Sequence, residues 1–167
     1  TNDFLYSSNQ FINNKGLISN YDLLLKNTNS YSNNSSTFKE NSNYDLFGTL
    51  KIDTSLPLQK RMQNFNHYLT PKISFRYSPN KNRNISSKDI LLNYNNVFAL
   101  NRIGTDHEVE GGESLSLGLE FKRENIENFN IFDFKLANVI RLEENKQLPT
   151  KSKLNKTRSD IFGSLVY

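Results

Sequence analysis

The sequence contains no cysteine, which excludes a disulfide framework and a thiolate metal site within these residues. The same absence leaves no clue to the redox state of the compartment. Histidine is scarce too, because His67 and His107 are the only two and are too few for a His-rich metal site. No apolar run approaches the ~18 residues that a membrane-spanning helix requires, so the sequence predicts no such helix.

Motifs that mark common enzymes are also missing. The sequence has no G-x-S-x-G nucleophile elbow, so Asp106, His107 and one of the many serines form no recognisable hydrolase triad. It has neither a P-loop nor a G-x-G-x-x-G motif. We therefore expect no enzymatic activity and no cofactor.

An acidic stretch at residues 105–113, TDHEVEGGE, offers oxygen ligands of the kind that Ca²⁺ prefers. Its acids are Asp106, Glu108, Glu110 and Glu113, and their spacing does not match the EF-hand loop. The alternative is a solvated or lumenal turn whose acids pair with Arg102 or a lysine. Because the spacing fails, we expect the turn and no metal site.

The composition is polar but rich in aromatic residues. Hydrophobic residues make up 35% of the chain, against the ~45–50% usual for soluble domains, a count that includes glycine. Aromatic residues reach 12%, more than a disordered chain carries, whereas a barrel with a polar lumen has this composition naturally. The net charge of +4 permits nucleic acid, anionic lipid or acidic glycan as partners. Because no basic cluster is interleaved with aromatics, we expect no nucleic-acid binding.

Two stretches alternate between apolar and polar residues: VEGGESLSLGLEFK at 109–122 and LTPKISFRYS at 69–78. A period of two places the apolar side chains on one face, so both stretches are β-strands and not helices. Both exceed the ~5–6 residues usual in soluble strands and suit the ~9–11 residues of an outer-membrane barrel strand. On these strands and the one that begins at Phe132, the residues expected to face lipid are Leu69, Ile73, Phe75, Leu115, Leu117, Leu119, Phe121, Phe132 and Phe134.

The same alternation predicts strands at 17–31, 44–54, 132–142 and 161–167, the third antiparallel to the strand before it. Residues 1–16 are rich in asparagine and end in a turn signal, and residues 32–42 form a polar loop. Residues 55–68 are a connection or an extension of the flanking strands. Pro57 ends one of these strands or marks an edge, because proline lacks the N–H that a ladder needs. Residues 89–103 fit neither period, so we interpret them as a partly ordered inward segment or a short strand.

These stretches predict an all-β fold, an antiparallel transmembrane β-barrel that is partial, with about seven meandering strands of a larger barrel. Residues 1–167 then form a single partial domain. An open barrel would leave two unpaired edges in lipid, and no signal peptide opens the chain, so we expect a longer protein. The aromatic residues, Tyr68 and Tyr77 among them, are expected to face lipid, those near strand ends in the interfacial girdles, with sugar stacking as the alternative.

From Leu69 onward, about the last three-fifths of the sequence resembles the C-terminal barrel domain of the LptD family, the lipopolysaccharide-assembly proteins of the outer membrane. Three stretches carry the resemblance: LTPKISFRYSPN at 69–80, NVFALNRIGTDHEVEGGESLSLGLEFK at 96–122, and LPTKSKLNKTRSDIFGSLVY at 148–167. The residues before about 66 match only in their strand rhythm.

The resemblance implies a function as well as a fold. It implies transport of lipopolysaccharide into the outer leaflet of the cell outer membrane, with this chain as part of the barrel wall and with no catalysis. The implied partners are lipopolysaccharide, outer-membrane lipid, an LptE-like lipoprotein plug and an LptA-like periplasmic bridge. The recurrent motif of the family maps onto Asn101, Arg102, Glu110, Gly111 and Gly112. Our hypothesis is that Arg102 and Glu110 form an inward polar pair that fixes a folded-in segment.

Two other functions stay open. A soluble all-β carbohydrate-binding or adhesin module would bury its apolar faces against a second sheet, with shorter strands and tighter turns. A general porin or receptor barrel would share the strand rhythm without the motif. Basic residues on the polar strand faces either meet lipid phosphates or only solvate the wall. The exposure of the apolar strand faces distinguishes the soluble module from the barrel, because a second sheet covers them in the module and lipid contacts them in the barrel.

Overall fold

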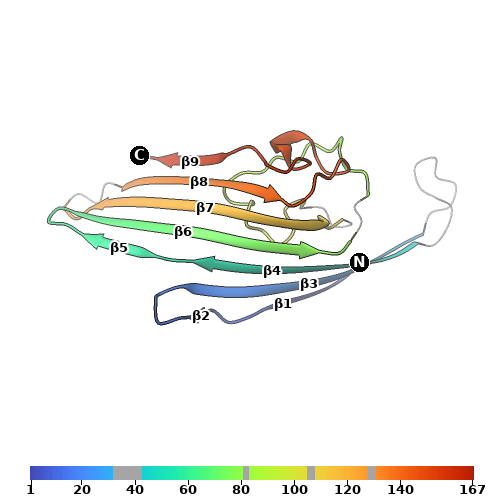
Figure 1. Cartoon of the computed structure of the whole chain (residues 1–167), viewed down its shortest axis with the longest axis horizontal. Helices are drawn as coiled ribbons and strands as arrows, with labels where there is room; N and C mark the ends of the chain where they lie inside the picture. The colour runs from blue at the N-terminus through green and yellow to red at the C-terminus, as the bar shows by residue number, and fades with distance from the viewer. Residues whose placement is uncertain (32–42, 81–82, 105–107, 128–130) are drawn as a thin grey trace.

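The protein folds into one antiparallel sheet whose long strands lie side by side (Figure 1). The computed structural model describes residues 1–31, 43–80, 83–104, 108–127 and 131–167. Within these ranges the order is β1-β3-β4-β6-β7-β8-β9, with β2 beside β3 and β5 beside β6. The order runs from β1 to β9 without returning, so the sheet is open. None of the helical segments described is long and apolar enough to cross a membrane.

The longest strands coincide with the alternating stretches of the sequence. The described strands are β1 Asn2–Ser7, β2 Phe11–Ile12, β3 Ile18–Ser30, β4 Asn43–Ser55, β5 Leu58–Arg61, β6 Phe65–Ser78, β7 Gly112–Asn125, β8 Ile131–Arg141 and β9 Phe162–Val166. β6 and β7 have 14 residues each, and β3 and β4 have 13 each. One 3₁₀ turn, Lys151–Lys153, lies before β9.

Neighbouring strands pair in continuous register, so the whole sheet has two chemically different faces. Phe75 of β6 lies opposite Leu115 of β7, and Ser74 lies opposite Ser116. The same alternation continues into β8, where Ile140 pairs with Leu115. We call the side that carries Phe75 and Leu115 the apolar face, and the side that carries Ser74 and Ser116 the polar face.

The two ends of the strands differ in the connections they carry (Figure 1). A tight turn joins β5 to β6, with the Met62 amide donating to the Phe65 carbonyl at 2.8 Å, and residues 126–130 join β7 to β8 at the same end. Residues 79–111 and 142–161 connect strands at the opposite end. We call these the short-turn end and the long-connection end.

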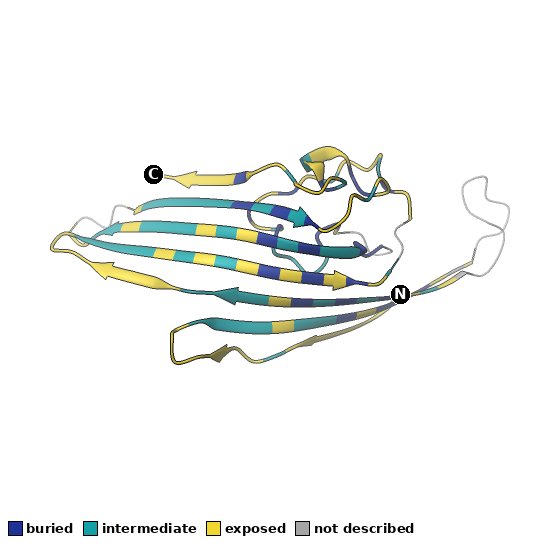
Figure 2. Cartoon of the chain, in the orientation of Figure 1, coloured by how far each residue is buried: buried dark blue, intermediate teal, exposed yellow. Residues whose placement is uncertain are grey.

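The apolar face is exposed, and the polar face is buried toward the long-connection end, which is the reverse of a sheet in a soluble domain. On the apolar face Tyr21, Leu25, Ile52, Ile73, Phe75 and Leu117 are each 37–41% exposed. On the polar face Thr49, Ser74, Arg76, Ser114 and Ser116 are each 1–3% exposed. Figure 2 shows that the buried residues of the strands gather toward the long-connection end.

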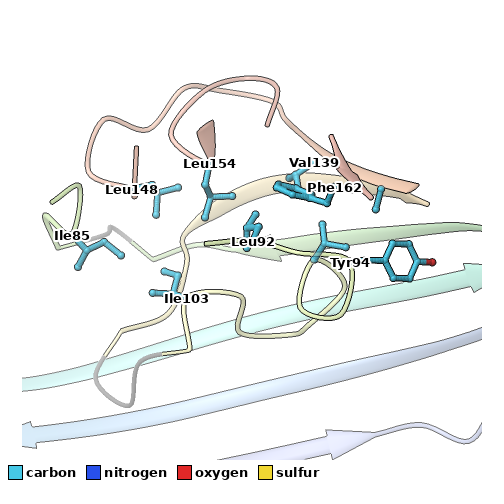
Figure 3. Close-up of a cluster of buried hydrophobic side chains, with 10 residues drawn as sticks. Ile85, Leu92, Tyr94, Ile103, Val139, Leu148, Leu154 and Phe162 are labelled. Carbon is cyan, nitrogen blue, oxygen red and sulfur yellow. The ribbon is translucent and has the colours of Figure 1, made fainter. Parts of the chain in front are cut away.

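The polar face is buried because two connections fold over it. Residues 83–104 and 108–111, which we call the covering segment, pack together with the connection from β8 to β9. Together with β8 and β9 they form a hydrophobic core, shown in Figure 3, of Ile85, Leu92, Tyr94, Val97, Ile103, Ala137, Val139, Leu148, Leu154 and Phe162. A second cluster of Leu24, Phe47 and Val109 joins the covering segment to β3 and β4.

The structure confirms the predicted all-β antiparallel fold and the strands at 17–31, 44–54, 132–142 and 161–167, each to within about two residues. β4 ends at Ser55, before Pro57, and residues 55–68 extend the strands through β5 and the start of β6. β8 is antiparallel to β7 as expected. The loop expected at 32–42 lies outside the described residues.

The sequence prediction missed two strands and left one segment open. Residues 1–16 hold β1 and β2, which the sequence did not predict, while the path of the sheet in the described ranges has the expected seven strands, with the short β2 and β5 beside it. Of the two interpretations offered for residues 89–103, the inward segment is confirmed, because these residues contain no strand and run inward over the polar face as part of the covering segment. β1 was missed because Phe4, Leu5 and Tyr6 are consecutive apolar residues and all three are exposed at the sheet edge.

Candidate functional site

Three arginines and one glutamate meet between the covering segment and the polar face of the sheet. Arg102 holds Glu110 in a bidentate pair, donating from Nε to Oε2 at 2.8 Å and from Nη2 to Oε1 at 2.6 Å. Arg141 of β8 donates from Nη1 to the same Oε1 atom. Nη1 of Arg76 lies 3.9 Å from Oε2. We call these four residues the ion cluster, and each is at most 4% exposed.

The ion cluster ties the covering segment to the wall of the sheet. Arg102 donates from Nη2 to the Ser114 hydroxyl at 2.6 Å and from Nη1 to the Ser116 hydroxyl at 3.1 Å. Ser116 in turn donates to the Val97 carbonyl at 3.1 Å. From the wall side, Arg76 donates from Nε to the Leu100 carbonyl at 2.9 Å. Small polar residues on β7 are therefore needed where the guanidinium of Arg102 lies against the sheet.

The two glycines of the motif make room for Arg141. The Gly111 carbonyl accepts a hydrogen bond of 2.7 Å from Nη2 of Arg141. Gly112 has a φ of +89°, and a Cβ placed on it would come within 2.8 Å of the same Nη2 atom. Both the backbone angle and the space favour glycine at this position. Asn101 completes the motif, because its side-chain amide donates to the Glu108 carbonyl at 3.3 Å.

Glu110 is held in its charged form. Burial alone would raise its pKa, because the charged form loses its hydration. The nearby guanidinium groups of Arg102, Arg76 and Arg141 outweigh burial and lower the pKa of Glu110 to about 2. Three positive charges against one negative leave the ion cluster with a formal excess of two positive charges. Such a cluster suits a structural role, because removal of its one acid leaves the charges of the buried arginines uncompensated.

A ladder of ion pairs occupies the polar face toward the short-turn end. Lys72 of β6 lies 2.6 Å from Glu120 of β7, and the Tyr94 hydroxyl of the covering segment donates to the same carboxylate at 2.8 Å. Lys135 pairs with Asp133 at 3.2 Å on β8. A cavity of about 440 Å³ opens here, lined by Asn20, Asp53, Lys72, Tyr94, Phe98, Glu120 and Lys135 among others. The lysines of this region are thus paired with acids of the wall.

All nine residues predicted to face lipid lie on the apolar face. Leu69, Ile73, Phe75, Leu117 and Leu119 are exposed, and Leu115, Phe121, Phe132 and Phe134 are half-buried among their sheet neighbours. Tyr68 does not join them, contrary to its expected lipid-facing position. Its register partner is Lys122 on the polar face, and the Lys122 Nζ atom lies 6.0 Å from the Tyr68 ring.

The acidic stretch is used for ion pairing. Glu110 belongs to the ion cluster, and Glu108 lies 3.5 Å from Nε of Arg83. Burial raises the pKa of Glu108, and the neighbouring Arg83 opposes that rise. No group of three or more acids and histidines is placed to hold a metal ion in the part of the chain that the structure describes. Asp106 and His107, the residues of the hypothetical hydrolase triad, lie outside that part.

The sequence did not identify Arg76 and Arg141 as members of the cluster. Both lie on the polar side of predicted strands, which is a signal for an inward position but not for a partner. Their place depends on register, since Ser114 pairs with Arg76 on one side and with Arg141 on the other. Register between distant strands cannot be derived from alternation alone.

A family model described as LptD: LPS transport system D matches residues 5–167. The match spans nearly the whole chain and so includes the first strands, where the sequence resembled that family only in rhythm. No curated protein matches the chain.

Proposed function

Because the chain belongs to the LptD family, which transports and assembles lipopolysaccharide at the outer membrane, we propose that it forms part of a transmembrane barrel wall there. In this role its apolar face contacts membrane lipid and its polar face lines the lumen. The protein then takes part in moving lipopolysaccharide into the outer leaflet. It performs no catalysis.

The observation that carries this proposal is the reversed polarity of the sheet. Exposing a continuous apolar surface to water costs free energy. Large exposed patches of this kind mark contact with a partner or a membrane. Strands of 13 and 14 residues that alternate apolar and polar side chains suit a bilayer-spanning barrel. Lipid supplies the missing cover for side chains such as Phe75 and Leu117.

The alternative functions fit less well. A soluble sandwich needs a second sheet over the apolar face, whereas the strands in the described ranges all belong to one sheet. A general porin or receptor barrel shares the architecture but not the family match over residues 5–167.

The proposal extends to protein partners. An LptE-like lipoprotein plug would meet the polar face where the cavity beside Tyr94 and Phe98 leaves it open. An LptA-like periplasmic bridge would deliver lipopolysaccharide to the assembled transporter. The ion-pair ladder, in which Lys72 pairs with Glu120 and Lys135 with Asp133, offers a charged but balanced surface to a plug.

Photocrosslinking from two phenylalanine positions tests the orientation of the wall. Benzoyl-phenylalanine replaces Phe75 on the apolar face or Phe47 on the polar face, in the whole protein within the native outer membrane. Phe75 is 39% exposed and Phe47 is 5% exposed. We expect lipid adducts from position 75 and only protein adducts from position 47. Lipid adducts at both positions or at neither would reject the proposed wall.

A further inference from the structure

A row of basic side chains crosses three neighbouring strands on the apolar face at the short-turn end. The register pairs Lys60 of β5 with His67 of β6, and His67 with Arg123 of β7. Strands lie about 4.8 Å apart, so the row is roughly 10 Å wide. The next row toward the long-connection end is apolar and consists of Leu58, Leu69 and Phe121. We call Lys60, His67 and Arg123 the basic row.

Aromatic rings pack against two members of the basic row, Arg123 and His67, without using their hydrogen-bond donors. The Arg123 guanidinium carbon lies 4.9 Å from the centroid of the Phe65 ring. The His67 ring lies 6.3 Å from that of Phe65 and 6.0 Å from that of Phe121. A guanidinium over a ring face keeps its N–H groups available at its edge.

The basic row has no acidic partner among the residues that the structure describes. Lys60 and Arg123 are exposed, and no described carboxylate forms an ion pair with either. Lys122 provides the contrast, because it is adjacent in sequence but lies on the polar face and pairs with Glu124. The basic row therefore presents unneutralised positive charge at the border of an apolar surface.

The depth of the basic row matches a membrane boundary. At the other border of the apolar band, Tyr77 pairs with Glu113, ten residues from His67 along β6 and from Arg123 along β7. Ten residues at about 3.4 Å each, tilted by about 40°, rise about 26 Å along the membrane normal. The apolar band of outer-membrane barrels is about 25 Å tall, and their short turns face the periplasm. The basic row then lies at the headgroups of the periplasmic leaflet.

We propose that Lys60, His67 and Arg123 bind the phosphate of an anionic phospholipid in the periplasmic leaflet. The inference rests on the proposed function, because it requires the apolar face to lie in a bilayer. Phosphate oxygens accept hydrogen bonds from the guanidinium, ammonium and imidazole groups, while Leu69 and Phe121 contact the acyl chains. The phosphates of lipopolysaccharide share this chemistry, but they belong to the opposite leaflet and face the Tyr77–Glu113 border.

Lipid retention by the reconstituted whole protein tests this site. The protein is inserted into vesicles of phosphatidylglycerol and phosphatidylethanolamine, extracted, and analysed by native mass spectrometry for bound lipid. The test variant carries Lys60→Gln and Arg123→Gln, and the control carries Lys122→Gln. We expect the wild type and the control to retain phosphatidylglycerol preferentially. The double variant should lose that preference about 30-fold, the combined effect of two basic residues near an anionic surface.

Three other results would each contradict a specific part of these proposals. If the double variant inserts normally and keeps the preference, the lipid site is rejected while the barrel wall stands. If the same substitutions abolish retention of lipid A but not of phosphatidylglycerol in parallel vesicles, the periplasmic assignment is rejected. Failure of the wild type to insert into any vesicle rejects the proposed function, and the lipid site with it.

Discussion

The ring of Phe98 in the covering segment lies directly against Gly118 in the middle of β7, and a Cβ on Gly118 would overlap that ring. Gly118 faces the polar side of the sheet, between Lys72 and Ala137 on the neighbouring strands. Phe98 also packs edge-to-face on Tyr94, with centroids 5.8 Å apart. The wall thus leaves space at the point where an aromatic side chain of the covering segment docks.

Substitution Gly118→Ala should weaken the docking of the covering segment. The added methyl group must displace the Phe98 ring, and overpacking of this kind typically costs about 1–3 kcal/mol. Thermal unfolding of the purified protein measures the loss. Gly48→Ala is the matched control, because a Cβ there meets Leu25 at an ordinary distance of 3.7 Å. Adding Phe98→Ala to Gly118→Ala should remove the clash. Equal losses of stability in Gly118→Ala and Gly48→Ala would contradict the packing explanation.

Substitution Glu110→Gln should release the covering segment from the wall. It removes the one acid of the ion cluster and leaves three buried arginines facing one another, and breaking a buried ion pair costs about 3–5 kcal/mol. Proteolysis of the folded protein should then cut within residues 83–104 faster than in the wild type. Glu113→Gln is the control, since Glu113 lies outside the cluster. Unchanged cleavage in Glu110→Gln would show that the cluster does not hold the segment.

The ion cluster should also make the covering segment sensitive to acid. The pKa of Glu110 is lowered from its ordinary 4.5 to about 2, so folding favours its charged form. The contribution of this charged form to the free energy of unfolding is fully present above pH 4.5 and is lost as the pH falls through 2. Hydrogen exchange of residues 96–104 between pH 7 and pH 2 should show protection that falls only in the acid range. Glu110→Gln should abolish the acid-dependent part of that fall.

A charge in the middle of the apolar face should destabilise the protein in a membrane. Leu117→Arg places a guanidinium near the centre of the apolar band, where the expected cost is about 2–4 kcal/mol. Leu142→Arg is the control, because Leu142 follows β8 at the long-connection end and is 67% exposed. Urea unfolding in vesicles compares the two variants. Equal midpoints would argue against lipid contact at Leu117.

Alternation predicted the long strands because a sheet with one apolar and one polar face imposes a period of two. It failed at β1, whose consecutive Phe4, Leu5 and Tyr6 lie at the sheet edge. It also failed over the covering segment, where Leu92 and Val97 are buried in irregular backbone. An irregular segment between a wall and another connection has no fixed period, so its fold depends on contacts that only the assembled sheet supplies.

The candidate site was predictable only where it is local in sequence. Arg102 and Glu110 are eight residues apart and pair in the structure as hypothesised. Arg141 lies 31 residues beyond Glu110 and reaches it only through the pairing of β7 with β8. Composition and spacing carry no information about that pairing, which is why the third and fourth members of the cluster were missed.

The ion cluster also has a consequence for how the sheet assembles. A strand that slides by two residues keeps its apolar side chains on the same face, so hydrophobicity does not distinguish the correct alignment from its neighbours. Sliding β8 by two residues would carry Arg141 about 7 Å along β7 and away from Glu110, which Arg102 anchors beside Ser114. A misaligned hairpin would then bury an unpaired guanidinium. The buried charges thereby favour one alignment of β8 on β7, since only that alignment places Arg141 against Glu110.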